Sequence, residues 1–233
     1  MDTAELAKLI KTRRSIRVFQ DKPVPEALLI QAVELATWAP NGGNGQNWRW
    51  YIILDKKVIN AVADAIDAGL DTMMTWPEMA MAGPPPRSAI LRKAPALIIA
   101  TTARSLRSAD EVFEKMMKTN PGEKKGFGAL QNVVIEKRAK TDPKAKEMFD
   151  GLEIINGRIQ STSAAVATLM LVLHQMGLGT VWMTGPLHAK ADIERALKLP
   201  AGLDVVTLIP VGYPAENPTR DRKPVSDVCE VIK

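Results

Sequence analysis

The segment Ser161–Met176 constrains the fold of this chain more than any other. Its apolar residues recur on nearly every face of a helix rather than along one stripe, and Gly177 follows as a helix-ending residue. Such a helix has to be covered on most sides, so we expect it at the centre of the protein. The uncharged apolar run within it, Ala164–Leu173, has about half the length that crosses a bilayer, which is roughly 20 residues. The pattern therefore predicts a buried core helix and no membrane span.

Further helices and strands are predicted around this core helix. Periodicity and end signals predict helices at Thr3–Thr12, from Pro25 to a stop at Pro40, at Lys57–Leu70 and at Ala189–Leu197. Branched and aromatic runs predict strands at Trp48–Leu54, Pro95–Thr101, Thr180–Met183 and Val205–Val211. A chain of 233 residues buries enough surface to need neither a disulfide nor a metal to hold its core. We expect a single α+β domain over residues 1–233 with a central sheet.

The composition limits the classes of ligand and partner that this chain is expected to bind. There are 31 Lys and Arg residues against 26 Asp and Glu, so the formal net charge is a mild +5, which favours small phosphorylated ligands over nucleic acid. The lone cysteine, Cys229, fits a reducing compartment, and the N-terminus lacks the pattern of a secretory signal. We expect a cytoplasmic protein with no membrane or nucleic-acid partner. His174, His188 and Cys229 lack the spacing of a zinc site, so no metal is expected; His174 is interpreted as a hydrogen-bonded core residue.

Residues 70–150 differ in character from the rest. They combine methionines, prolines and charged stretches. Such a segment suits an adaptable cover over a binding site, and a solvated surface insertion is the alternative. We therefore predict a lid or insertion within the domain.

Two basic clusters are suited to phosphate. The first is R-R-S-I-R at positions 13–17, in which guanidinium groups and a hydroxyl can grip a phosphate. In an extended segment Arg13, Ser15 and Arg17 project together, while Ile16 packs inward. The second is R-D-R-K-P at positions 220–224. The alternatives are a basic surface for the first and a solvated tail for the second.

The loop P-N-G-G-N-G-Q-N-W at positions 40–48 is rich in hydrogen-bond donors. It lies between a predicted helix and a predicted strand, and a flexible turn is the alternative. No phosphate-binding P-loop, nucleophile elbow or C-x-x-C motif occurs. Gly177-Leu178-Gly179 lacks the third glycine of a dinucleotide fingerprint and follows a helix, so it is not interpreted as one.

In this order and spacing the motifs resemble those of the nitroreductase-like flavoproteins, including the iodotyrosine deiodinase type. The resemblance rests on R-R-S-I-R, W-A-P-x-x-x-N-x-Q-x-W, G-L-G-T-V-W-M-T-G-P-L and I-P-V-G-Y-P…R-x-R-K-P, and it covers residues 5–60 and 160–228. It implies a central mixed sheet flanked by helices and an intertwined homodimer that binds FMN at its interface.

The resemblance also implies which residues hold FMN. The phosphate, ribityl chain and pyrimidine edge would be held by Arg13, Arg14, Ser15, Arg17, Arg220 and Arg222. The opposite subunit would contribute Pro40, Asn41, Gly42 and Gly43, and backbone N–H groups near the flavin N5 would come from Met183, Thr184 and Gly185. This chain has Asn41 where many members have Ser, and Asn47 where many have Pro, so the side-chain role of Asn41 is not carried over.

The activity that the resemblance implies is that of an NAD(P)H-dependent FMN oxidoreductase. It would use NADH or NADPH to reduce a small planar acceptor, of nitroaromatic or quinone type, by ping-pong hydride transfer at the flavin N5, with no catalytic side chain. Gly43, Trp76 and Phe113 are the candidates for acceptor contacts. A reductive dehalogenase of the same fold, or a basic anion-binding or nucleic-acid-binding module, are the alternatives.

Overall fold

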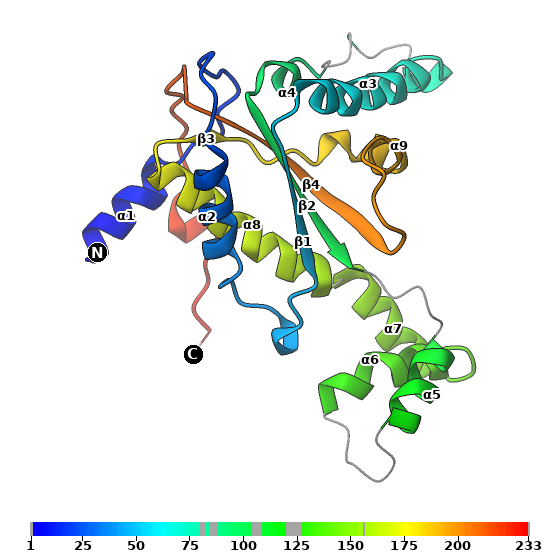
Figure 1. The fold of residues 1–233 in the computed structure, drawn as a ribbon. Helices are drawn as coiled ribbons and strands as arrows, with labels where there is room; N and C mark the ends of the chain where they lie inside the picture. Colours follow the sequence, from blue (N-terminus) through cyan, green and yellow to red (C-terminus); the bar gives the residue numbers. More distant parts are fainter. Residues whose placement is uncertain are drawn as a thin grey trace.

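The centre of the structure is a four-stranded sheet with the strand order β1–β2–β4–β3 (Figure 1). The computed structural model describes residues 2–79, 83, 88–103, 109–119, 127–155 and 157–232. The strands are β1 (Trp48–Ile53), β2 (Ala96–Ala103), β3 (Gly179–Thr180) and β4 (Leu203–Gly212). Each neighbouring pair is antiparallel, and the parallel pairing in the described residues is one isolated bridge between Ser15 and Thr180. The sheet is therefore antiparallel rather than mixed as the resemblance implied, because the Ser15 segment meets β3 at one bridge and forms no strand.

Helices cover both faces of the sheet. One face packs against α2 (Glu26–Ala36) and α8 (Gly157–Gln175), and the other against α3 (Lys56–Met73), α4 (Ala89–Lys93) and α9 (Lys190–Ala196) (Figure 1). Outside these layers lie α1 (Thr3–Thr12), α5 (Ala109–Thr119), α6 (Phe127–Arg138) and α7 (Pro143–Ile155). Short 3₁₀ turns are η1 (Gly42–Asn44), η2 (Pro77–Met79), η3 (Gly185–Ala189) and η4 (Val225–Asp227).

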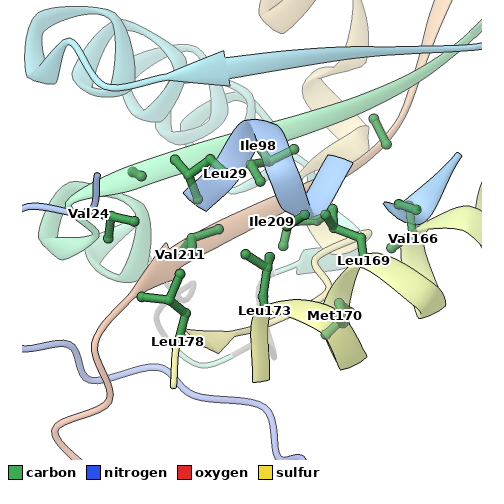
Figure 2. Close-up of a cluster of buried hydrophobic side chains, with 14 residues drawn as sticks. Val24, Leu29, Ile98, Val166, Leu169, Met170, Leu173, Leu178, Ile209 and Val211 are labelled. Carbon is green, nitrogen blue, oxygen red and sulfur yellow. The ribbon is translucent and has the colours of Figure 1, made fainter. Parts of the chain in front are cut away.

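The predicted core helix is α8. Its Leu169 and Leu173 are fully buried and reach toward Ile209 of β4, beside Leu29 of α2 (Figure 2). Gly177 follows with φ of +80°, a backbone conformation that glycine adopts without strain, and this ends the helix. No helix of the described residues is long and apolar enough to cross a membrane.

Several predicted boundaries are wrong. The strand expected at Thr180–Met183 is reduced to Gly179–Thr180, and Met183 meets β4 through an isolated bridge to Leu208. Pro25 caps α2 from outside, so Glu26 is the first helical residue.

The predicted lid range cannot be one insertion. Strand β2 lies within residues 70–150, and it is buried along nearly its whole length at the centre of the sheet. Helices α5, α6 and α7 pack on one another at the far end of α8, beyond the sheet (Figure 1). Residues 80–82, 84–87, 104–108 and 120–126 of this range lie outside the described part of the chain. A lid or insertion therefore stays a prediction only for the parts of residues 70–150 that precede and follow β2.

Candidate functional site

A cavity of about 680 Å³ lies between the end of α1, the outer side of α8 and the segment 220–222. Its walls combine cationic groups with an apolar floor, and they are formed by Ile10, Lys11, Arg13, Arg14, Ser15, Ala167, Met170, Leu171, Trp182, Arg220, Asp221 and Arg222. Five cations thus face one carboxylate. The fold brings together the two basic clusters that the sequence analysis selected from opposite ends of the chain.

The first basic cluster is held in place by the residue in its middle. Ile16 is buried, and its N–H donates to the carbonyl oxygen of Thr180 at 2.9 Å. A Cβ built on Gly179 would lie 2.8 Å from the Ile16 side chain, so only glycine permits this close packing. The predicted inward packing of Ile16 is confirmed, and it leaves Ser15 at the wall of the cavity.

Two arginines at the cavity carry buried nitrogen atoms without a partner. Arg14 Nη1 donates to the carbonyl oxygens of Lys11 and Arg13, which satisfies the C-terminal end of α1. Arg14 Nε and Arg13 Nη1 are buried and have no hydrogen-bond acceptor. Because an unpaired buried donor is costly, these atoms fit a ligand that supplies acceptor oxygens.

The charges around Arg13 point to an anion. Burial lowers the pKa of Arg13, and the neighbouring charges of Arg222 and Arg14 lower it further. No acidic group contributes to this shift, so the positive charges repel one another. A phosphate group would relieve that repulsion and supply acceptors for the buried nitrogen atoms.

His174 lies behind the basic cluster on α8. Its Nε2 is 2.9 Å from Thr12 Oγ1, and burial lowers its pKa, with Arg13 and Arg14 adding to that effect. The neutral imidazole is therefore favoured near pH 7. The hydrogen bond expected of His174 is present, but the residue is half-buried and not part of the core. Among the described residues there is no group of three His, Cys, Asp or Glu side chains arranged for a metal ion.

The loop that carries Asn41 lies away from this cavity. The N–H of Gly42 donates to Ser161 Oγ at 3.3 Å, close to the start of α8. The nearest α8 residue that lines the cavity is Ala167, which is six residues from Ser161, or about 9 Å along the helix at 1.5 Å per residue. A Cβ on Gly42 or Gly43 would meet nothing within 4 Å, and Gly43 has φ of +60°. Within one chain this loop does not line the cavity.

The segment Met183–Gly185 is only partly available to a ligand. The N–H of Met183 donates to the Leu208 carbonyl oxygen at 3.0 Å, so it is already engaged within the chain, and a flavin contact of Met183 stays a prediction. Thr184 precedes η3, and a Cβ on Gly185 would meet nothing within 4 Å. Flavin contacts of Thr184 and Gly185 stay a prediction.

Three other predicted residues do not line the cavity. Arg17 is exposed and Arg17 Nη1 donates to the Ser15 carbonyl oxygen at 3.3 Å. Trp76 is half exposed just beyond α3, and Phe113 of α5 lies 4.9 Å from the Lys137 ammonium group. Their roles stay predictions.

Sequence reasoning missed the apolar floor. Met170 and Leu171 come from the outer side of α8, and Trp182 comes from the segment after β3. Trp182 stands inside the G-L-G-T-V-W motif, which was a usable signal. The α8 residues gave none, because their pattern is that of a core helix.

Comparison with known proteins identifies the family. The model of the Nitroreductase family matches residues 10–213, which is most of the chain. The chain belongs to the nitroreductase family. It is accordingly a nitroreductase-family flavin oxidoreductase.

Relatives of this nitroreductase-family chain share its length and fold. A protein of Methanothermobacter thermautotrophicus, provisionally named NADH dehydrogenase/NAD(P)H nitroreductase, is 27% identical over 221 residues, which cover 93% of this chain and 82% of the relative. The crystal structure of a BluB-like flavoprotein from Clostridium difficile 630 has a TM-score of 0.72 at 22% identity and covers both chains completely. An iodotyrosine deiodinase bound to FMN and 3-iodo-L-tyrosine has a TM-score of 0.63 at 21% identity, with 98% of this chain and 97% of the other covered.

Proposed function

We propose that this enzyme binds FMN in the cavity between α1, α8 and residues 220–222. With NADH or NADPH as the reductant, it would reduce a small planar acceptor of nitroaromatic or quinone type by a ping-pong reaction. The observation that supports this most directly is the pair of buried, unpartnered nitrogen atoms, Arg13 Nη1 and Arg14 Nε, at a cavity with five cations. A solved structure of the same fold, the iodotyrosine deiodinase, is bound to FMN.

Different cavity residues would bind different parts of FMN. Arg13, Arg220 and Arg222 supply charge-assisted hydrogen bonds to a phosphate that carries nearly two negative charges. The Ser15 hydroxyl adds a neutral donor, and Trp182 gives apolar surface for a planar ring. Hydride acceptance from the nicotinamide and hydride delivery to the acceptor are the chemistry that FMN supplies when bound. The side chains have to bind, orient and exclude water, so no protein nucleophile is needed.

The position of the Asn41 loop supports a homodimer. The loop lies near the start of α8, and within its own chain it does not line the cavity. Apolar side chains are also exposed: Trp38 beside this loop is 84% exposed, and α1, elsewhere on the surface, buries none of its residues. In an intertwined homodimer these surfaces would be covered, and the partner's loop would complete the site. Obligate interfaces of this kind bury on the order of 2,000–5,000 Å².

The acceptor would be chosen by segments outside the FMN-binding part. Trp76 and Phe113 lie within residues 70–150, on either side of strand β2. Gly43 lies on the Asn41 loop, which a partner chain would bring to the site. Reductive dehalogenation is the second candidate activity, because the fold matches an iodotyrosine deiodinase over nearly the whole of both chains.

A panel of acceptors tests the proposed activity. The FMN-loaded protein would be mixed with NADH or NADPH and then with a nitrobenzoate, a benzoquinone or a halogenated phenol. Faster turnover of the first two supports the proposal. Halide release from the phenol at a higher kcat/KM favours the dehalogenase, and no turnover of any acceptor overturns both.

A further inference from the structure

The carboxylate of Glu216 binds two consecutive backbone amides next to the first basic cluster. Glu216 Oε1 accepts hydrogen bonds from the N–H of Arg17 at 2.5 Å and from the N–H of Val18 at 3.0 Å. Glu216 lies on the segment that leads from β4 to Arg220, and Arg17 follows the segment that carries Ser15. One side chain therefore joins the two chain segments that form the cationic walls of the cavity.

This contact completes a short zipper between the two segments. The N–H of Gln20 donates to the Tyr213 carbonyl oxygen at 2.8 Å, and the N–H of Ala215 donates to the Val18 carbonyl oxygen at 3.0 Å. Beyond Ala215 the backbone pairing ends, and the Glu216 side chain takes over as the acceptor. Consecutive amides that point at one oxygen form a concave anion site, which the carboxylate fills from within the chain.

The second basic cluster has few described hydrogen bonds of its own. The hydrogen bonds described within residues 217–222 are confined to one between Arg222 Nη1 and the carbonyl oxygen of Asp221. Arg220 is four residues beyond Glu216, so an anchored Glu216 limits its Cα to about 14 Å from that point. Without the carboxylate contact, the last fixed point before Arg220 is Ala215, through its N–H to the Val18 carbonyl oxygen, and no side chain ties the amides of Arg17 and Val18 to this segment.

We propose that Glu216 is a positioning residue of the cofactor site, which holds the two basic segments together so that both face one phosphate. The inference rests on the proposed binding of FMN. Charge alone predicts the opposite effect, because a carboxylate near a phosphate site opposes anion binding. The proposal predicts that removing the Glu216 carboxylate weakens FMN binding, whereas charge alone predicts that it strengthens FMN binding, and this difference makes the proposal testable.

The test compares Glu216→Gln and Glu216→Ala with the parent and with a matched control. Gln retains a carbonyl oxygen that can accept from both amides, while Ala removes the acceptor. Glu34→Gln on the exposed side of α2 is the control, since it changes the same charge away from the cavity. Apoprotein would be titrated with FMN and with riboflavin, which lacks the phosphate, and Tm and the hydrogen exchange of the Arg17 and Val18 amides would be measured.

The proposal predicts a selective loss of phosphate recognition. Glu216→Ala should raise the Kd for FMN about tenfold or more, Glu216→Gln should fall between Ala and the parent, and the Kd for riboflavin should stay within about twofold. Faster exchange at Arg17 and Val18 should accompany the loss, and Glu34→Gln should behave as the parent.

Three results would overturn the proposal. The first is FMN binding in both Glu216 variants that is as tight as in the parent or tighter. The second is an equal loss of FMN and riboflavin binding that follows a lowered Tm, which indicates general destabilisation. The third is a parent protein that binds no FMN. This result would also overturn the proposed function, and it is distinguished from the other two because the Glu34→Gln control binds no FMN either. If Glu216→Ala does not fold, the near-isosteric Glu216→Gln still decides between the two signs.

Discussion

Replacing Arg13 with methionine should weaken FMN binding without destabilising the apoprotein. The Arg13 guanidinium is at the cavity with a buried, unpartnered Nη1, and burial lowers its pKa, with the charges of Arg222 and Arg14 lowering it further. Methionine retains most of the apolar stem, so packing is largely preserved. The substitution also removes a charge that its surroundings repel.

The magnitude follows from the contacts that the phosphate would make. A hydrogen bond to a charged group contributes about 1.5–3 kcal/mol, so its loss should raise the Kd for FMN by about 10–150-fold. In the apoprotein Arg13 Nη1 has no partner to lose, and the relief of repulsion acts in the stabilising direction. The free energy of unfolding of the apoprotein should therefore stay equal or rise.

The assay is a fluorescence titration of FMN at two salt concentrations, combined with urea unfolding of the apoprotein. The dependence of the Kd on salt should be smaller in Arg13→Met, because one phosphate contact is missing. Arg195→Met is the matched control, since Arg195 is exposed on α9 and is paired with Asp192. Unchanged FMN affinity in Arg13→Met would refute the phosphate assignment, and a loss of unfolding free energy well above that of the control would show that Arg13 serves the fold instead.

Three further predictions concern other parts of the molecule. Sedimentation at micromolar concentration should show a dimer, and an FMN-saturated monomer would contradict the role given to the partner's loop. Trp76→Ala and Phe113→Ala should change the kcat/KM values for nitroaromatic and quinone acceptors by different factors at full FMN content; unchanged ratios would place acceptor selection elsewhere. Burial opposes the charge of Asp67, but hydrogen bonds from Arg92 and Ser88 outweigh it and lower the pKa of this carboxyl. Its stabilising contribution is complete above the ordinary carboxyl pKa of about 4 and is lost as the pH falls through the lowered value, so Asp67→Asn should reduce the loss of Tm in acid; an unchanged acid profile would contradict this.

The features that the sequence predicts well are those decided by local pattern. The all-round apolar character of α8 fixes it in the core, and α1 has the expected bounds, Thr3–Thr12. The alternation of residues 13–17 correctly turns Ile16 inward and leaves Ser15 at the cavity, but Arg14 lines the cavity where Arg17 was expected. In each case one residue type at one spacing decides the structure.

The features that it does not predict depend on partners far along the chain. The hydrogen bond from the Met183 N–H to the Leu208 carbonyl oxygen depends on how β4 pairs with residues 179–183. The shortening of β3 depends on the same pairing. Glu216 gives no local signal, because its two hydrogen-bond partners, the amides of Arg17 and Val18, lie about 200 residues away in the chain. The sheet direction likewise depends on which strands meet, and this is a property of the whole topology.

The most direct test of the account is the flavin content of the purified protein. The protein would be isolated, its absorption spectrum recorded, and the chromophore released by denaturation, identified by chromatography and quantified against the protein. The account predicts a yellow protein that releases close to one FMN per chain, or a colourless apoprotein that reaches this ratio when FMN is added. A protein that takes up no FMN, yet binds polyanions with an affinity that falls steeply with salt, would contradict it and indicate a general anion-binding surface.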